Sequence, residues 1–412
     1  MKKVMMLGAN NGQIPFIKIC KKQGAEVVAV SIAGDYPGFH IADKIYYCDI
    51  SDKEGVLNIA RKEKIDAVLT DQTDVSVPTA AYVADKMGLK GIGYETAIKF
   101  SDKYIMRCEA KKAGVGVPSF AEVSDYDEAV TAIKNMKYPV MVKPTNSSGS
   151  RGVHKINSMA ELKMAVHDSI QYSSNKKAII EEFIEGKEYI VDGLALDYRY
   201  INTDLGIKEY FNKPNMYISK MCMFSSAEMI EDEKEKMVLN ANEKLVKSMK
   251  LKFGITHGEY IYSERDNKVY LVEIAARGGG VYLSSDLTPL ASGIQTNEIL
   301  IDYVLNNTRY DLENLKFDRK VSAWRCFELA PGIIHTISGV EETKKVPGVY
   351  KVCLEDLYIG KEVKELINDT RKHGPILVWG TSREECFSSL REVEKTLKVE
   401  TIGENGIQGI YW

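Results

Sequence analysis

Two runs of β-branched and aromatic residues, separated by a turn, constrain the fold of this chain more than any other feature. The runs are Gly254–Tyr262 and Val269–Glu273, and Asp266-Asn267 between them has the residue types of a tight turn. With the turn centred near Asp266, Glu259 lies opposite Glu273 on one face of the hairpin. Like charges facing each other across two strands repel. This register therefore predicts either a bound cation or an exposed hairpin with two weakly repelling glutamates.

The residues after this hairpin favour the bound cation. Arg277 and three glycines, Gly278–Gly280, follow the second strand directly. Carboxylate oxygens suit magnesium, which usually keeps several waters and takes further ligands from substrate phosphates. The hairpin is thus a candidate site for a divalent ion carried by a nucleotide.

The bulk composition is that of an ordinary globular protein with about two to four domains. Of the 412 residues 44% are hydrophobic and 27% charged, and the net charge is −3, so neither a nucleic-acid surface nor an acidic tail is expected. No apolar run approaches the roughly 18 residues of a membrane span. Val4–Leu7 is too short for a signal peptide and predicts a buried strand. Seven scattered cysteines without a Cys-x-x-Cys pair predict reduced thiols in a cytoplasmic protein.

The first hundred residues alternate between apolar strands and helical patterns, which predicts a parallel sheet with helices on both faces. The predicted strands are Val4–Leu7, Glu26–Ile32, Lys44–Tyr47 and Ala67–Thr70, and the predicted helices are Ile14–Gln23, Lys53–Lys62 and Val77–Met87. Ligands of such sheets bind beyond the carboxyl ends of the strands. The loops expected there are Gly8–Gln13, Gly34–Tyr36 and Asp71–Asp74.

The remaining three hundred residues predict at least two further domains. Ser101 is the expected N-cap of a helix that runs to Lys112. A small α/β unit is expected over about 118–187, and the helix Lys234–Met249 precedes the hairpin. A Pro- and Gly-punctuated β region begins near Phe317 and includes the helix Ser382–Thr396.

A glycine-containing loop follows the predicted strand Tyr138–Pro144. This loop, Thr145–Gly152, lets backbone N–H groups approach a phosphate, and Lys143 supplies a positive charge beside it. It is not a Walker loop, because no Gly-Lys-Ser/Thr follows. The alternative is a flexible hairpin tip.

The segment Glu181–Glu188 is a strand that runs into an acidic connector. Its backbone groups and Glu181 have the chemistry to read an adenine edge, and Glu188 can accept hydrogen bonds from ribose hydroxyls. The alternative is a surface connector without a ligand.

These motifs together resemble the ATP-grasp superfamily. Lys103, Lys143 with its loop, the Glu181–Glu188 segment, and the set of Glu259, Glu273 and Arg277 stand in the order and approximate spacing of that superfamily. The resemblance spans the whole chain. It is strongest to the carboxylate–amine ligase branch, near the L-amino acid ligases, and more distant to D-alanine–D-alanine ligase and the carbamoyl-phosphate synthase large subunit.

The resemblance implies an α/β fold, α+β overall, in three parts. A parallel-sheet preATP-grasp domain would occupy residues 1–100, a two-part ATP-grasp clamp residues 101–315, and a β-rich C-terminal α+β domain residues 316–412. The lid subdomain of the clamp would span about 118–187.

The resemblance also implies a role for each matching residue. The ATP phosphates would be contacted by Lys103 and Lys143 and covered by Ser147, Ser148, Gly149 and Gly152. The adenine would be held by Glu181, Phe183 and Ile184, and the ribose by Glu188. Magnesium would be bound by Glu259 and Glu273, and the catalytic residues would be Arg277 and Gly279. Lys213 either reaches the γ-phosphate or is an ordinary surface lysine. Many members have Glu-x-Asn where this chain has Glu273-Ile274-Ala275, so one metal ligand is absent or replaced by water.

The implied function is ATP-dependent ligation. A carboxylate would be activated as an acyl phosphate and coupled to an amine, with an amino acid as substrate and with Mg²⁺, or Mn²⁺, as the metal. The expected partners are small-molecule substrates, no nucleic acid, no membrane, and a second copy in a homodimer.

Two further sites keep two interpretations each, and a third residue has one suggested role. Asp71–Asp74 either holds the ammonium of an amino acid or caps a helix, His257 either assists deprotonation or is a hydrogen-bonded structural residue, and Arg325 is a candidate for fixing a substrate carboxylate.

Other functions remain open on the sequence alone. The first is a biotin-carboxylase-like, formate- or bicarbonate-activating ATP-grasp enzyme, although no Met-Lys-Met biotin site occurs. More distant are an NAD-dependent oxidoreductase, for which Gly8-Ala9-Asn10-Asn11-Gly12 lacks the Gly-x-Gly-x-x-Gly pattern, and a non-catalytic nucleotide sensor.

Overall fold

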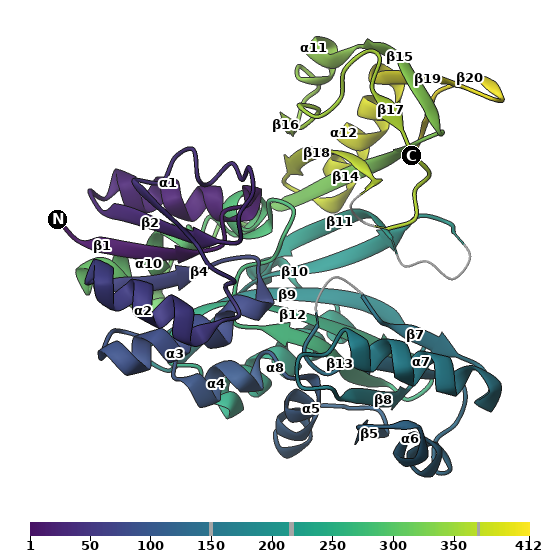
Figure 1. The fold of residues 1–412 in the computed structure, drawn as a ribbon. Coiled ribbons are helices and arrows are strands. Elements are labelled where there is room, and N and C mark those ends of the chain that lie inside the picture. Colours follow the sequence, from purple (N-terminus) through teal and green to yellow (C-terminus); the bar gives the residue numbers. More distant parts are fainter. Residues whose placement is uncertain (148–150, 214–217, 369–370) are drawn as a thin grey trace. The chain divides into compact units, whose positions relative to one another are not determined.

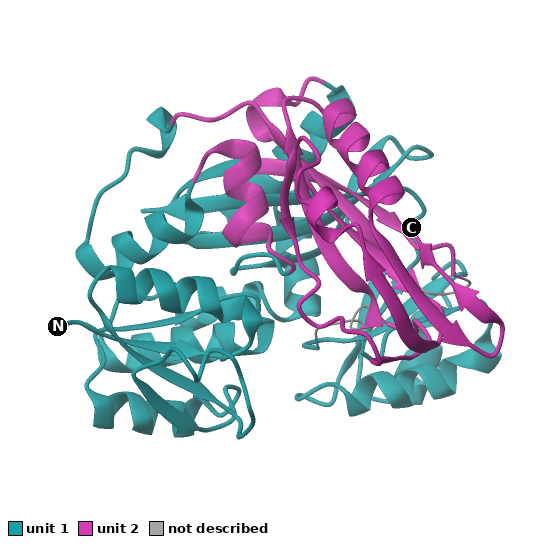
Figure 2. Cartoon of the chain, turned by 90° about the horizontal axis from the view of Figure 1, so that it is seen from above, with its two compact units in different colours: residues 1–202, 232–280, 295–315 teal, residues 203–231, 281–294, 316–412 magenta. Residues whose placement is uncertain are grey.

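The computed structural model describes residues 1–147, 151–213, 218–368 and 371–412. It divides into two compact units, each assembled from segments that are distant in the sequence (Figure 2). Unit 1 contains residues 1–202, 232–280 and 295–315, and unit 2 contains residues 203–231, 281–294 and 316–412. The described segments include no helix with the length and apolar character that a membrane crossing requires. None of the seven cysteines forms a disulfide.

Unit 1 begins with the predicted parallel sheet, whose strand order is β3-β2-β1-β4. The strands are β1 (Lys3–Leu7), β2 (Glu26–Ser31), β3 (Lys44–Tyr47) and β4 (Ala67–Thr70). Helix α1 covers one face, and α2 and α3 cover the other (Figure 1). The helices of this region are α1 (Ile14–Lys22), α2 (Lys53–Glu63), α3 (Val77–Met87) and α4 (Tyr94–Lys99).

The core of this sheet explains why the short strands form. Met5, Leu7 and Val30 are completely buried and pack against Val56 of α2 and Val83 of α3. Strands buried on both faces need such continuous apolar runs. The carboxyl ends of β1 and β4 consequently meet, followed by the short helices η1 (Asn11–Gln13) and η2 (Asp74–Ser76).

The segment of unit 1 for which a lid subdomain is expected contains a separate antiparallel sheet with the order β5-β8-β6-β7. Its strands are β5 (Phe120–Val123), β6 (Val140–Pro144), β7 (His154–Ile156) and β8 (Ala178–Glu182), and its helices are α6 (Tyr126–Ile133) and α7 (Met159–Gln171). Val140 and Val142 of β6 are buried, whereas Lys143 between Val142 and Pro144 is partly exposed. Alternation along β6 thus directs Lys143 away from the core.

Helix α5 (Lys103–Lys112) begins one residue later than predicted. Asp102, not Ser101, is the N-cap, and its carboxylate accepts the N–H of Ile105 at 3.0 Å. Ser101 instead donates to the carbonyl of Ala97 at 2.8 Å. The prediction of Ser101 as the cap was wrong because both residue types cap well, and the preceding helix α4 engages Ser101.

The third sheet region of unit 1 places β12 (Gly254–Ser263) between β9 (Lys187–Leu196) and β13 (Lys268–Ala275), all antiparallel. The adjacent helices are α8 (Glu233–Met249) and α10 (Thr296–Asn306). The predicted hairpin is therefore present, and Asn267 in its turn adopts a φ of 47°.

Unit 2 is rich in β structure, as predicted for the C-terminal part of the chain. The strands of the nine-stranded sheet that belong to unit 2 have the order β10-β11-β14-β18-β16, and a separate sheet has the order β17-β15-β19-β20. The strands are β10 (Arg199–Tyr210, in unit 2 from residue 203), β11 (Ser219–Ser226), β14 (Val321–Leu329), β15 (Gly332–Ser338), β16 (Val349–Val352), β17 (Glu362–Val363), β18 (His373–Gly380), β19 (Lys398–Gly403), β20 (Gly406–Gln408) and β21 (Ile410–Tyr411).

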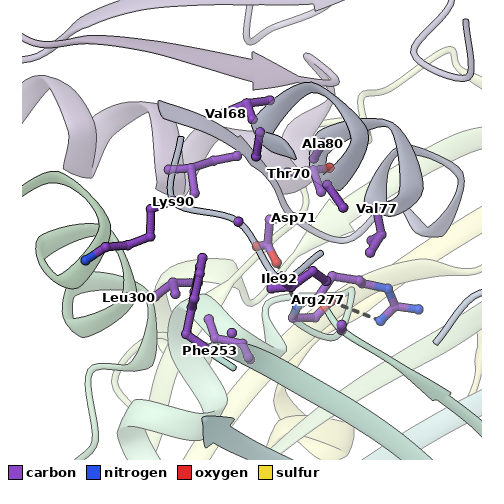
Figure 3. A pocket seen from close by; sticks show the side chains of 18 of the residues that line it. Val68, Thr70, Asp71, Val77, Ala80, Lys90, Ile92, Phe253, Arg277 and Leu300 are labelled. Carbon is purple, nitrogen blue, oxygen red and sulfur yellow. Dashed lines mark hydrogen bonds between the residues drawn. The ribbon is translucent and has the colours of Figure 1, made fainter. Parts of the chain in front are cut away.

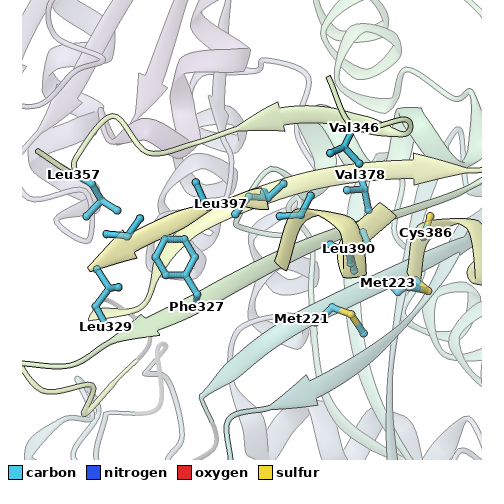
Figure 4. Close-up of a cluster of buried hydrophobic side chains, with 14 of the residues drawn as sticks. Met221, Met223, Phe327, Leu329, Val346, Leu357, Val378, Cys386, Leu390 and Leu397 are labelled. Atoms are coloured by element: carbon cyan, nitrogen blue, oxygen red, sulfur yellow. The ribbon is translucent and has the colours of Figure 1, made fainter. Parts of the chain in front are cut away.

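The core of unit 2 is a cluster of buried apolar side chains (Figure 4). Phe327 of β14 and Val378 of β18 are completely buried there, together with Cys386 and Val393 of α12 (Arg383–Thr396). The other helical segments of this unit are η3 (Ala227–Met229), η4 (Leu283–Leu287), α9 (Thr288–Ser292) and α11 (Val340–Thr343), and η5 (Leu312–Asn314) belongs to unit 1.

Candidate active site

The two glutamates of the hairpin are paired as the register predicted. Glu259 of β12 and Glu273 of β13 are directly opposite each other in the antiparallel ladder, next to a β-bulge between Glu259 and Tyr260. Their side chains are 30% and 33% exposed, so both carboxylates are accessible to a ligand. Two carboxylates at one ladder position repel unless a cation lies between or beside them.

Lys103 supplies one such cation. Its Nζ atom donates to Oε1 of Glu273 at 2.9 Å and to the carbonyl of Ser147 at 2.9 Å. Lys103 is the first residue of α5, and only 8% of its side chain is exposed. Lys103 thereby connects the hairpin to the start of the glycine loop. Ser148 and Gly149 lie outside the described residues, whereas Ser147 and Gly152 are described.

Lys143 forms a buried charge cluster with Glu181 and Arg107. The Glu181 carboxylate accepts from Lys143 Nζ at 2.8 Å through one oxygen and from Arg107 Nε through the other. Burial alone would raise the pKa of Glu181, but these two cations outweigh it and lower the pKa to about 2. The carboxylate is therefore charged at neutral pH, and both of its oxygens bind protein cations.

Arg107 is a site residue that the sequence interpretation missed. Besides Glu181 it contacts the carbonyl of Val272, at 2.7 Å, one position before Glu273. A signal was present, because Lys103 and Arg107 are four residues apart on one helix and therefore share a face. The Nη1 atom of Arg107 is buried and has no hydrogen-bond partner among the described residues.

Arg277 is held by the loop that follows β4. Its Nε atom donates to Oδ1 of Asp74 at 2.8 Å and its Nη2 atom to Oδ2 at 3.1 Å. Burial has the largest single effect and opposes the charge of Asp74, but the Arg277 guanidinium together with the charges of Lys103 and His257 lowers the pKa of Asp74 below its usual range. The pair is therefore ionised at neutral pH.

The loop also holds the residue after Arg277. The backbone N–H of Gly278 donates to Oδ1 of Asp71 at 2.9 Å, and Asp71 has no exposed surface. Neither aspartate acts as an N-cap, because Thr73 precedes η2 and Ser76 precedes α3. Thr73 of this segment occupies the N-cap position of η2, without a side-chain capping hydrogen bond, and the ammonium-binding interpretation of Asp71–Asp74 stays a prediction.

His257 is fixed from both sides. Its Nδ1 atom lies 2.8 Å from Oδ1 of Asp192, and its Nε2 atom lies 3.7 Å from Oε1 of Glu259. Burial lowers the pKa of the imidazole, but Asp192 and Glu259 together outweigh burial and raise the pKa to about 9. An imidazole protonated at neutral pH is not a general base, so these contacts favour the structural interpretation.

The predicted nucleoside residues lie along one strand connection. The N–H of Phe183 donates to the carbonyl of Pro139 at 3.0 Å, and Lys155 Nζ lies 3.6 Å from the centre of the Phe183 ring. Ile184 follows in the connection to β9, and Glu188 pairs with Ile261 in the β9–β12 ladder. Their adenine and ribose roles stay predictions.

Two other predicted residues belong to unit 2. Lys213 Nζ donates to Oε1 of Glu328 at 2.7 Å. Arg325 is buried and its Nη2 atom lies 2.9 Å from Oε1 of Glu394. The roles proposed for Lys213 and Arg325 in substrate binding stay predictions.

A large cavity of unit 1 reaches Glu273 of the hairpin and Asp74 of the loop after β4. It has a volume of about 680 Å³ and is lined by Asp74, Glu273, Asp102 and Ser147 among others. A smaller cavity of about 70 Å³ lies beside Asp71 and Arg277 (Figure 3). Its other walls are mainly apolar and include Phe253 and Leu300, and the Arg277 guanidinium points away from these two side chains.

The described residues contain no group of three or more His, Cys, Asp or Glu side chains arranged to hold a metal ion. The Glu259 and Glu273 pair fits a magnesium ion that takes its other ligands from water and phosphate, because hard oxygen donors are what that ion prefers.

Comparison with known proteins identifies two domains in this chain. Residues 136–285 match the family model described as ATP-grasp domain, and residues 325–401 match L-amino acid ligase C-terminal domain 2. The fold and the matched domain define the chain as an ATP-grasp protein. The chain also carries a match to the C-terminal domain 2 of the L-amino acid ligases. The expected superfamily and fold class are confirmed, and the oxidoreductase alternative finds no support.

Two sequence relatives extend this result. The formate-dependent phosphoribosylglycinamide formyltransferase of Ignicoccus hospitalis is 28% identical over 50% of this chain and 51% of its own length. The C-terminal section of the carbamoyl phosphate synthase large chain of Methanopyrus kandleri is 23% identical over 79% of this chain and 57% of its own length. The chain thus spans only about half the length of these curated relatives.

Two solved structures share the fold. The L-amino acid ligase of Bacillus licheniformis has a TM-score of 0.80 and 20% identity, covering 97% of this chain and 98% of its own. The biotin carboxylase domain of the 2-oxoglutarate carboxylase of Hydrogenobacter thermophilus, solved with MgADP and bicarbonate, has a TM-score of 0.73 and 18% identity, covering 100% and 91%.

Proposed function

We propose that this chain is an ATP-dependent ligase that converts a carboxylate into an acyl phosphate and joins it to an amine, with an amino acid among its substrates. The observation that carries the proposal is the Glu259–Glu273 pair in the β12–β13 ladder, with Lys103 in contact with Glu273. The L-amino acid ligase C-terminal domain at residues 325–401 supports the amino acid as substrate.

The chemistry explains why cations gather around this pair. A carboxylate does not react with an amine because its oxygen is a poor leaving group, and phosphorylation by ATP overcomes this. The transfer brings two anions together, so the site has to neutralise charge. Lys103, Lys143 and Arg277 are all held in fixed positions by carboxylates of the same unit.

Glu259 and Glu273 would hold Mg²⁺, or Mn²⁺, with the nucleotide. When bound, such an ion neutralises phosphate charge and orients the phosphates. The exposed third of each glutamate side chain leaves room for this role. With Ala275 in place of an amide ligand, the protein supplies two carboxylate ligands and no third from this position.

Other residues of unit 1 would bind the nucleotide. Lys103 and Lys143 would contact phosphates, and the loop from Ser147 to Gly152 would cover them and keep water from the acyl phosphate. Because the Glu181 oxygens bind Arg107 and Lys143, we expect its side chain to position these cations and the backbone near Phe183 to contact adenine.

Arg277 and Gly279 would serve the acyl transfer. Arg277 would stabilise the acyl phosphate and the tetrahedral intermediate. The N–H of Gly278 already donates to Asp71, so the oxyanion would be met by the N–H of Gly279.

The test is a screen of paired amino acids, small carboxylates and bicarbonate for ATP-dependent phosphate release, with hydroxylamine added to trap an activated acyl group. We expect phosphate release and a hydroxamate only when an amino acid or related carboxylate is present. A chain that consumes no ATP under any pairing would contradict the proposal.

A second candidate is activation of formate or bicarbonate. It is favoured by the formate-dependent relative and by the bicarbonate-bound structure of similar fold. Phosphate release with formate or bicarbonate alone, undiminished when all amino acids are omitted, would select this candidate.

A further inference from the structure

The loop after β4 binds two successive residues at the end of β13. Asp74 forms two parallel hydrogen bonds with the Arg277 guanidinium, at 2.8 and 3.1 Å. Asp71 accepts the backbone N–H of Gly278 at 2.9 Å. Asp74 and Arg277 are 203 residues apart in the sequence. Paired bonds of this kind fix direction as well as distance.

The loop itself is held by η1, the short helix that follows β1. The Gln13 side chain donates to the carbonyl of Asp71 and, at 3.2 Å, to Oγ1 of Thr73. The Gln72 side chain donates to the carbonyl of Gly12 at 3.1 Å. Asp71 is completely buried, and the side chains of Asp74 and Arg277 are 19% and 14% exposed. In such surroundings water competes weakly for these hydrogen bonds.

The hydrogen bonds of Arg277 leave a defined donor pair. A guanidinium has five N–H groups. Among the described residues, Asp74 accepts one from Nε and one from Nη2, and the carbonyl of Gly278 accepts one from Nη1 at 3.0 Å. One N–H remains on each terminal nitrogen. Two such donors match the two oxygens of a carboxylate or phosphoryl group.

We propose that Asp74 is a positioning residue for Arg277, and that Asp71 positions the glycine segment that follows it. The N-terminal sheet would thereby aim the remaining guanidinium donors and the next backbone N–H groups at the reacting carboxyl group. The inference rests on the proposed function, because it requires that Arg277 meets the acyl phosphate. It replaces the idea that Asp74 receives the substrate ammonium, since the Asp74 oxygens already bind Arg277.

The first test is Asp74→Asn, which keeps the shape of the side chain and removes one acceptor and the charge. We expect kcat to fall about a hundredfold, as for a misdirected catalytic donor, while KM for ATP changes less than about threefold. Asp74→Glu should recover part of kcat. The control is Asp85→Asn on the neighbouring helix α3, which changes a carboxylate that accepts the N–H of Tyr94 at 2.8 Å.

The second test separates positioning from stability. If Asp74 acts through Arg277, Asp74→Asn should change kcat less than about threefold in an Arg277→Ala background. If the double variant instead loses kcat by the product of the two single-variant losses, the two residues act independently and the proposal is overturned. So would an Asp74→Asn enzyme with normal kcat, or one in which only KM for the amine rises, because that pattern means direct substrate binding.

The wild-type reaction distinguishes a failure of the positioning role from a failure of the proposed function. If the wild type releases phosphate with an amino acid but Asp74→Asn behaves like Asp85→Asn, the positioning role fails and the proposed function stands. If the wild type releases none with any pairing, the proposed function fails and the positioning role falls with it. Thermal unfolding of every variant accompanies these assays, and a kcat loss that merely follows the loss of folded protein would also overturn the positioning role.

Discussion

The β12–β13 ladder of unit 1 and the β14–β18 ladder of unit 2 are both antiparallel, but they bury their side chains differently. Burial alternates along β12 near Glu259, and Glu273 of β13 is partly exposed beside the buried Ile274, so one face of the ladder remains accessible. Nearly every residue of β14 and most of β18 are buried. A strand buried on one face can present charged groups, whereas a strand buried on both faces contributes mainly to stability. The same secondary structure thus serves chemistry in one unit and packing in the other.

The strongest test of this contrast is Glu273→Ala. We expect the variant to lose ATP consumption, because Glu259 alone cannot hold a metal ion against the phosphates, while its unfolding midpoint stays close to that of the wild type. The control is Glu264→Ala in the turn, whose side chain is 67% exposed and binds Lys234. Near-normal phosphate release by Glu273→Ala would show that the metal assignment is wrong.

The converse change is Phe327→Ala in unit 2. Phe327 is completely buried, with its ring centre 5.2 Å from that of Trp412. We expect the free energy of unfolding to fall by about 3–5 kcal/mol, the usual effect of removing a large buried aromatic side chain. ATP affinity of the folded protein should remain unchanged, as measured by calorimetry. A variant with wild-type stability would contradict the role of this core.

The charge cluster of Glu181 predicts a pH dependence of stability. Its folded pKa of about 2 lies below the ordinary value of 4.5, although burial opposes the shift. The stabilisation is therefore complete above about pH 4.5 and is lost as the pH falls towards 2, a change of about 3 kcal/mol. Denaturant unfolding between about pH 5 and pH 3 should show a steeper loss of stability in the wild type than in Glu181→Gln. Equal slopes would refute the prediction.

The smallest expected effect concerns Lys143→Ala. Loss of this phosphate contact should weaken ATP binding about tenfold, roughly the strength of one hydrogen bond to a charged group. Calorimetric titration with ATP measures the change. Lys177→Ala is the matched control, because Lys177 forms a comparable ion pair with Glu122 but is 41% exposed. An unchanged ATP affinity in Lys143→Ala would count against the proposed phosphate contact.

Local sequence patterns predicted much of the fold. The parallel sheet, the helix Val77–Met87 and the hairpin register all appear as expected, because apolar periodicity and turn residues act over a few neighbouring positions. Even here the cap of α5 was misplaced by one residue, since Ser101 and Asp102 are both good caps and only the contact of Ser101 with Ala97 separates them.

By itself the sequence determined the types and order of the strands and helices, and the pairing of Glu259 with Glu273. Only the tertiary structure decided which charges neutralise one another. Arg107 with Glu181, and Asp74 with Arg277, are 74 and 203 positions apart. Such pairs are chosen by packing, because burying a charge is favourable only where a partner of opposite charge is brought within hydrogen-bond distance. No spacing along the chain encodes that distance.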